Sequence, residues 1–395
     1  MAVNAEGLEE EHAAPPASPD FAQSEDHPDC DLHAGYSGDG VSPMAQNPDA
    51  NFNSQREEAA APILQQLLVR GPLSRNQLRE CTGFSPASIT NYTRALLSRG
   101  LLLSEPVAVA GSKRPVSFLR IAPDCGSAIL LRTESNSLTA ELLALNGEVR
   151  AERIVAYEAR NQSGVLGAIG HAVAALFKRA RDEQLEPLLA GLGAAGSVAP
   201  EYGIVFDLQG VTDWEPCQPG EILPVLREIP SFMVWTQVSC KVAGLAVSRK
   251  NDHRLAYLDF SGNTLRLASL QNGRILLGRY GTVSALLHRT VARNGSPCYC
   301  GRRGCLVPII ENGRATEKII VNLVRRLATE LDVSVMGIEG PEATERLERQ
   351  VAGRCLDALV RVSEGAAYTA RGLRYLAAKA ALLRLLAGKT QPQAD

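Results

Sequence analysis

The strongest constraint on the fold is an internal repeat. The run ILLRTESNSLTAELLALNGEV, which begins at Ile129, is echoed by LAYLDFSGNTLRLASLQNGRILLG from Leu255. The Asn-Gly pair at 146–147 recurs at 272–273, and such a pair between apolar runs is typical of a hairpin turn. Each copy therefore predicts a three-strand meander. Two copies, each followed by helices, predict a duplicated α/β body with a cleft between its halves.

The apolar runs around the two copies place further elements. Short runs rich in small or β-branched residues predict strands, and longer runs with helical spacing predict helices. The expected strands are 128–131, 138–143, 149–157, 188–196 and 232–235, and the expected helices are 164–180 and 366–386.

Composition indicates a soluble globular chain in a reducing compartment. The 395 residues are 45% hydrophobic and 21% charged, enough for two or three domains. No apolar run has the length of a membrane helix, and the acidic start lacks the basic region of a signal peptide. Nine cysteines, an odd number, favour free thiols and metal binding over a disulfide framework. We therefore expect a cytoplasmic protein without a membrane partner.

The formal net charge of -2 hides a strong asymmetry along the chain. The first Lys or Arg is Arg56, and the preceding residues are rich in Ala, Pro, Ser, Asp and Glu without a periodic apolar face. Such a segment cannot bury enough surface to offset its ordering entropy. We expect residues 1–52 to be a disordered acidic tail.

Residues 53–122 predict a winged helix-turn-helix domain. Apolar residues recur at helical spacing from Gln55 to the Gly-Pro at 71–72, and a second helix begins at Ser74 and stops at Gly83. Ser85 and Pro86 provide an N-cap and first-turn proline for a third helix. Two strand-like runs around a basic turn at 111–115 complete the plan, whose third helix is built to lie in the major groove of DNA.

The polar side of the third helix suggests base contacts. Asn91 is the candidate for an adenine edge, and nearby arginines would position the helix on the DNA backbone. The alternative to DNA binding is a three-helix interaction domain with ordinary surface charge. The candidate DNA-binding residues are Arg75, Ser85, Ser88, Thr90, Asn91, Arg94, Lys113 and Arg114.

A short loop carries a metal-ligand pattern. Cys298, Cys300 and Cys305 lie in a short loop punctuated by glycines and follow His288. One imidazole and three thiolates are a set that structural Zn²⁺ prefers in tetrahedral geometry, and glycines allow the tight turns that bring them together. Cys-x-Cys is too close for a comfortable disulfide. The alternative is a loop with free or disulfide-bonded cysteines.

The wording of this loop, C-x-C-G-x-x-G-C-L behind a histidine, resembles the zinc loop of the ROK family (repressors, open reading frames and sugar kinases). The helical region before it resembles the N-terminal module of ROK repressors. The resemblance implies a ribonuclease-H-like, actin-type sugar-kinase fold for residues 123–395, with structural zinc that braces a loop on the cleft wall.

The resemblance also shows which kinase groups are replaced. The family's two sugar-binding glutamates correspond to Ala285 and Val307, and its catalytic aspartate falls on Val238 or Ser239. Its glycine-containing phosphate turn reads Arg-Thr-Glu-Ser-Asn at 132–136, where a carboxylate would repel phosphate. We expect no catalytic residues.

The sequence therefore predicts a DNA-binding transcriptional regulator, as a repressor, with a non-catalytic sugar-kinase-like effector and dimerisation domain. Expected partners are an operator in double-stranded DNA, a sugar or sugar-derived effector with unassigned contacts, and a second copy in a homodimer or dimer of dimers. Two alternatives remain. One is an ATP-dependent sugar kinase fused to a DNA-binding module, and the other is a redox or metal sensor based on the cysteine loop.

Overall fold

The computed structural model describes residues 59–108, 115–250, 254–260, 265–278, 283–298, 300–313, 316–340, 345–352 and 355–387. The expected acidic tail and the turn with Lys113 and Arg114 lie outside these ranges.

We call residues 59–122 the head, which contains three helices and a small sheet of order β1-β3-β2. The three helices lie where the apolar spacing predicts them, and β1 is an addition to the expected pair of strands. The elements are α2 (Ala61–Arg70), β1 (Leu73–Ser74), α3 (Arg75–Thr82), α4 (Pro86–Ser98), β2 (Leu102–Val107) and β3 (Val116–Ile121).

Side-chain caps fix where the head helices begin. Ser74 and Gln77 form a capping box at the start of α3, and Gly83 ends this helix in the left-handed conformation. Ser85 accepts a hydrogen bond from the N–H of Ser88 at the start of α4. The turn between α3 and α4 is therefore determined at both of its ends.

The body, residues 123–387, contains two five-stranded sheets with the same topology. The first sheet has the order β10-β7-β4-β5-β6, and the second has the order β13-β12-β11-β14-β15. In each, an antiparallel three-strand meander is extended by two parallel strands. The internal repeat seen in the sequence is thus a repeat of the fold.

The strand and helix bounds of the body are as follows. The first sheet consists of β4 (Ser127–Thr133), β5 (Ser137–Ala144), β6 (Val149–Ala156), β7 (Pro187–Ala194) and β10 (Phe232–Thr236). The second consists of β11 (Arg254–Asp259), β12 (Arg266–Gln271), β13 (Arg274–Ile275), β14 (Val335–Glu339) and β15 (Ala358–Val362). The long helices are α5 (Gln162–Asp182), α8 (Gln237–Arg249), α10 (Glu317–Glu330) and α12 (Gly365–Leu386). The shorter elements are β8 (Val198–Ala199), β9 (Ile204–Val205), α6 (Pro219–Ile222), α7 (Pro224–Arg227), the 3-10 helix η2 (Ser284–Leu287), α9 (Leu306–Glu311) and α11 (Glu345–Val351).

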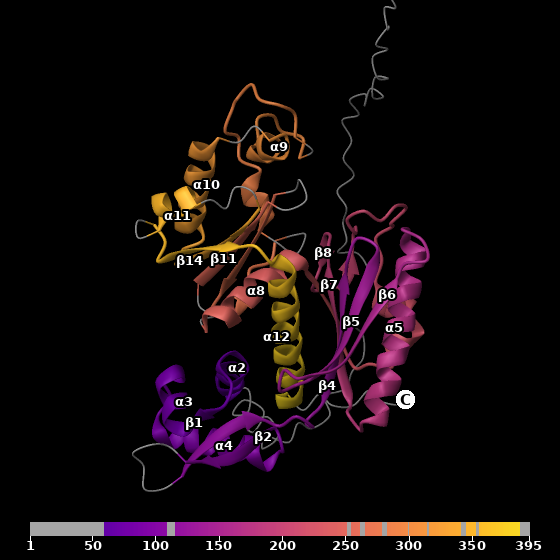
Figure 1. The fold of residues 1–395 in the computed structure, drawn as a ribbon, viewed down its shortest axis with the longest axis vertical. Coiled ribbons are helices and arrows are strands. Elements are labelled where there is room, and N and C mark those ends of the chain that lie inside the picture. Colours follow the sequence, from indigo (N-terminus) through magenta and orange to yellow (C-terminus); the bar gives the residue numbers. More distant parts are fainter. Residues whose placement is uncertain are drawn as a thin grey trace, which may run out of the picture. The chain divides into compact units, whose positions relative to one another are not determined.

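Helices cover both faces of each sheet, and the alternation of side chains along the strands shows how. In β4, Ile129 packs in a cluster with α5, whereas Leu130 packs in a cluster with α8 and α12. In β11, Tyr257 faces α8 and α12, whereas Leu258 packs with α10 and α11. The pair α8 and α12 therefore lies between the two sheets, with α5 and the α10–α11 pair on the outer faces (Figure 1).

α12 also contacts the head. Leu64 of α2 and Leu382 of α12 belong to one hydrophobic cluster. Arg99 donates to the main-chain carbonyls of Leu385 and Leu386 at the end of α12. Arg70 donates to the carbonyl of Lys250 at 3.1 Å.

Two glycines allow α8 and α12 to approach each other closely. A Cβ atom on Gly372 would lie 1.7 Å from the carbonyl oxygen of Cys240, and one on Gly244 would lie 2.1 Å from the carbonyl oxygen of Tyr368. Arg374, on the same helix α12, forms a bidentate ion pair with the buried Glu141 of β5 at 2.6 and 2.7 Å. Main-chain contact and a charged pair thus fix the position of α12.

We predict that Gly372→Ala destabilises the protein by about 2 kcal/mol or more, because rigid backbone on both helices must move apart to admit a methyl group. Gly167→Ala is the matched control, since Gly167 is an exposed residue of α5 with no atom near its would-be Cβ. It is expected to be neutral or to stabilise by up to about 1 kcal/mol. Thermal melting distinguishes the two, and equal melting temperatures would contradict the proposed close contact.

Candidate functional site

The structure brings the predicted ligand residues His288, Cys298, Cys300 and Cys305 together, and we call them the His/Cys cluster. Their ligand atoms all lie within 4.8 Å of one another. Cys298 Sγ lies 3.3 Å from His288 Nδ1, and Cys300 Sγ lies 3.6 Å from Cys305 Sγ. Tetrahedral bonds of about 2.3 Å from zinc to sulfur would place two sulfurs about 3.8 Å apart. The spacing fits a single tetrahedral cation.

Main-chain hydrogen bonds and the closely packed Gly304 shape the loop. The N–H of Cys298 donates to the carbonyl of Arg302, and the N–H of Gly301 donates to the carbonyl of Cys298. These two hydrogen bonds close a tight turn around the cluster. A Cβ atom on Gly304 would lie 1.6 Å from the carbonyl oxygen of Ala292. The glycine punctuation in the sequence therefore corresponds to a steric requirement of the loop.

The acid–base properties of the cluster also suit a cation. Burial and the neighbouring thiols Cys300 and Cys298 raise the pKa of Cys305 to about 12. Burial, with the charge of Arg302, lowers the pKa of His288, so its imidazole is neutral at pH 7, as a metal ligand requires. Without a cation the buried thiol would stay protonated. The eight cysteines in the described part of the chain are free thiols, so none of them is held in a disulfide.

The head places Thr90, Asn91 and Arg94 together on the exposed side of α4. The opposite side of the helix buries Ile89 and Leu96. The hydroxyl of Thr90 donates a hydrogen bond to the carbonyl of Pro86 at 2.9 Å, whereas Asn91 and Arg94 face solvent. The polar face is thus held by a helix whose other side is fixed in the core.

The remaining candidate DNA-binding residues have structural contacts. Ser85 and Ser88 share a hydrogen bond of 2.9 Å at the start of α4, although Ser85 is exposed. Arg75 is half-buried and donates to Thr93 of α4 at 3.1 Å, which joins α3 to α4. Lys113 and Arg114 lie outside the described residues.

The positions that the family resemblance assigns to the catalytic aspartate and to the two sugar-binding glutamates carry neither an acid nor a base. Val238 and Ser239 are buried in the first turn of α8, and Ser239 is hydrogen bonded to Thr236, the N-cap of that helix. Val307 is buried in α9, and Ala285 lies in η2. At the end of β4, the carboxylate of Glu134 lies 3.3 Å from the guanidinium of Arg132.

Sequence reasoning missed a buried ion triad formed by Lys241, Asp259 and Glu339. Lys241 Nζ lies 2.7 Å from Asp259 Oδ2 and 2.8 Å from Glu339 Oε2, and the hydroxyl of Tyr257 donates to Glu339 at 2.9 Å. Asp259 and Glu339 end the parallel neighbours β11 and β14, and the carboxyl ends of such strands are where α/β proteins bind ligands. Here that edge holds an internal ion triad.

Within the described part of the chain, no helix is long and apolar enough to cross a membrane.

Known proteins similar to this chain include bacterial regulators. The DNA-binding transcriptional dual regulator NagC of Escherichia coli K12 is 26% identical over 294 residues, which cover 72% of this chain and 70% of NagC. The transcriptional repressor Mlc of the same strain is 22% identical over 273 residues, 67% of this chain and 66% of Mlc.

A solved structure shows the same fold. The crystal structure of a ROK family transcriptional regulator, described as a homolog of E. coli Mlc, superposes with a TM-score of 0.59 at 19% identity and covers 84% of this chain and 99% of that chain. The model of the ROK family matches residues 135–352, more than half of the sequence. With its duplicated sheets and its His/Cys loop, the chain belongs to the ROK family.

Proposed function

We propose that this protein is a DNA-binding transcriptional repressor of ROK type. In this proposal residues 53–122 are a winged helix-turn-helix domain, residues 1–52 are a disordered tail, and residues 123–395 are a non-catalytic effector and dimerisation domain. The observation that carries the proposal is the exposed polar face of α4, with Thr90, Asn91 and Arg94. The names of the relatives, NagC and Mlc among them, support it.

The geometry of α3 and α4 favours groove binding over an ordinary surface. A recognition helix must present short polar side chains and a rigid N-terminal turn to base edges. α4 has both, because Ser85 caps it and Arg75 ties it to α3. Asn91 is long enough for a bidentate contact with adenine, and Arg94 lies one turn further along for phosphate or guanine.

Selection of genomic fragments that bind the purified protein tests the function. Enrichment of a defined sequence, with salt-sensitive affinity, is the expected result. A chain that shows no preference for any duplex is not a repressor of this kind. Because recognition helices of a dimer read half-sites about one DNA turn apart, we expect the enriched sequence to be a palindrome.

We predict that Asn91→Ala weakens binding to the selected duplex by about 1–3 kcal/mol and relaxes the preference at one base pair. If Arg94 contacts phosphate, Arg94→Ala should weaken binding to all duplexes by the same factor. It should also reduce the slope of log affinity against log salt concentration by about one. Arg181→Ala, at an exposed residue of α5 paired with Glu228, is the control and should change neither. Fluorescence anisotropy at several salt concentrations measures these values, and wild-type affinity in both head variants would exclude α4 as the reading element.

We further propose that the His/Cys cluster holds structural Zn²⁺. Three thiolates and one imidazole leave no open position for chemistry, which distinguishes a structural from a catalytic site. Bound zinc would keep the buried thiol of Cys305 deprotonated and would stabilise the turn before α9. The cation would stabilise the fold by mass action, by about 4 kcal/mol at a thousand times its Kd.

We predict about one zinc per chain in the purified protein. Cys305→Ser should lose this zinc and melt at a lower temperature, whereas Cys355→Ser, a half-buried thiol outside the cluster, should keep it. Elemental analysis and thermal melting measure both effects. A chelator should unfold the protein and abolish DNA binding at the same concentration. Release of DNA by chelator or peroxide from a protein that remains folded would instead support the redox or metal sensor.

The absence of kinase activity is the third part of the proposal. A sugar kinase needs a carboxylate base near the accepting hydroxyl, and the first turn of α8 contains no acidic residue. The ion triad adds a second obstacle, because it fills the strand ends with paired charge and an excess carboxylate. Clear ATP turnover with a hexose or amino sugar in a coupled assay would overturn this part in favour of the fused kinase.

We predict that the ion triad is structural and that Lys241→Met destabilises the protein by about 3–5 kcal/mol, because the buried Asp259 and the half-buried Glu339 lose their cation. Arg254→Met is the control, since Arg254 and Asp332 form an exposed pair at 2.8 Å, and it should cost less than about 1 kcal/mol. The shift of the urea midpoint measures each effect. Similar shifts in the two variants would show that the triad contributes no more than a surface pair.

A further inference from the structure

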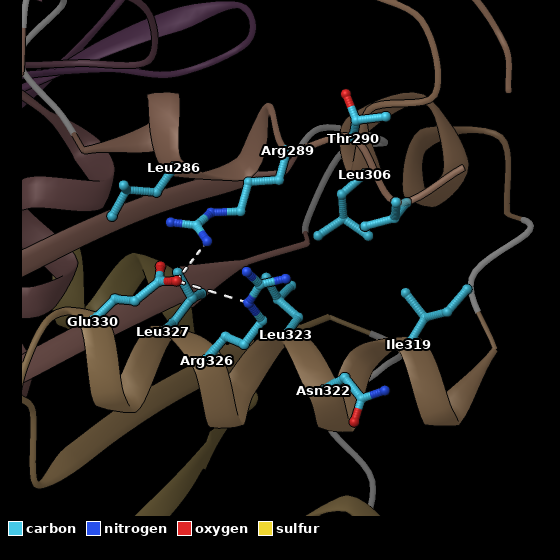
Figure 2. Close-up of a pocket in the computed structure, with 11 residues that line it drawn as sticks. Leu286, Arg289, Thr290, Leu306, Ile319, Asn322, Leu323, Arg326, Leu327 and Glu330 are labelled. Carbon is cyan, nitrogen blue, oxygen red and sulfur yellow. Dashed lines mark ion pairs between the residues drawn. The ribbon is translucent and has the colours of Figure 1, made fainter. Parts of the chain in front are cut away.

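A pocket of about 410 Å³ lies beside the His/Cys cluster, between α10 and the segment that follows η2. This volume is in the range of small-molecule sites. Figure 2 shows the side chains that line it, and neither the kinase-type edge nor the polar face of α4 contributes to it.

One part of the pocket is apolar. Leucines from three elements form its floor, and those of α10 are fixed in the core, with Leu323 6% and Leu327 1% exposed. The apolar surface that a ligand can reach comes from the half-buried Leu286 and Ile319 and from Val291, which is 48% exposed. Leu286 comes from η2 and Leu306 from α9. A ligand in this place would exchange water for aliphatic surface, so an apolar body is favoured over a polyol such as a sugar.

The charged part of the pocket has an excess positive charge. Arg289 Nη1 lies 2.5 Å from Glu330 Oε1, and Arg326 Nε lies 3.7 Å from the same oxygen. Figure 2 shows both guanidinium groups directed toward Glu330, from two separate segments. Two guanidinium groups share one carboxylate, and the distance from Arg326 is too long for a hydrogen bond. The donors of Arg326 are therefore placed for a second anion.

The pocket shares its backbone with the His/Cys cluster. Arg289 follows His288 directly, and its carbonyl accepts from the N–H of Leu306 at 2.9 Å. Thr290, another lining residue, forms a β-bridge with Cys305. A ligand that contacts Arg289 and Leu306 thus touches the neighbours of two cluster residues.

We propose that this pocket binds a small organic anion, a carboxylate carried on an apolar aryl or alkyl body. The carboxylate would accept hydrogen bonds from Arg326 and, in competition with Glu330, from Arg289. The apolar body would lie on the leucine wall. Charge complementarity selects an acid over a neutral molecule, and the aliphatic wall selects it over a hydrophilic anion such as inorganic phosphate.

Calorimetric titration of the full chain with benzoate, phenylacetate and octanoate tests the site, with the matching primary amides as neutral probes. We expect at least one carboxylate to bind with a stoichiometry of one and its amide to bind at least tenfold more weakly. Arg326→Gln should weaken the carboxylate about tenfold or more, because a hydrogen bond to a charged group is lost. Arg346→Gln is the matched control, an exposed arginine paired with Glu317 at 3.0 Å outside the pocket, and should bind as the wild type does.

Three outcomes would overturn the proposal. They are no binding of any of these carboxylates at millimolar concentration, equal binding of acid and amide, and wild-type affinity in Arg326→Gln. Since Arg326 is an exposed side chain, 61% accessible, its replacement should leave the fold intact, and thermal melting checks this.

A second measurement asks whether the site is regulatory, a step that rests on the proposed function. We expect the bound carboxylate to change the affinity for the selected duplex in the wild type and to leave it unchanged in Arg326→Gln. If the chain binds carboxylate without a change in DNA affinity, the site stands and its regulatory role is wrong. If the chain binds no DNA at all, the repressor proposal fails while the titration still decides the site.

Discussion

The arrangement of the body depends on the close contact between α8 and α12. Both helices meet through glycine, Gly244 on one and Gly372 on the other, at distances that leave no room for a methyl group. The same pair of helices packs against the inner faces of both sheets, and α12 also contacts α2 of the head. A change in the separation of these helices would therefore shift the contacts of both sheets and of the head, the part that we propose binds DNA.

Local signals in the sequence were sufficient for the head and for the first meander. Ser74, Gly83 and Ser85 specify helix ends through short-range hydrogen bonds and backbone conformation. These helix ends can therefore be predicted from the local sequence, without knowledge of the tertiary fold. The repeated Asn-Gly pair likewise predicted two hairpins. At the second pair, Asn272 and Gly273 both have positive φ, the conformation that such a turn requires.

The His/Cys cluster was predictable for the same reason, because its four ligands lie in one short segment of chain. The ion triad was not. Lys241 lies 18 residues before Asp259, but Glu339 comes from a distant part of the chain, and only the parallel pairing of β11 with β14 and the packing of α8 bring the three together. A lysine within an otherwise apolar helix, and single acids that end apolar strands, were the signals available. Their partners could be assigned only from the topology of the sheet.

The ion triad has a consequence for how such a chain can change. A nucleotide brings several negative charges, and the triad at the edge that could receive it contains two carboxylates and one ammonium group. Removal of Lys241 alone would leave two poorly solvated carboxylates without their cation. Introduction of a catalytic base near Val238 alone would leave the ion triad in place at the strand ends. If the body is non-catalytic, as we propose, a route to phosphoryl transfer would pass through sequences less stable than the starting one. In the non-catalytic body that we propose, paired charge in the interior would therefore oppose the stepwise gain of phosphotransfer chemistry.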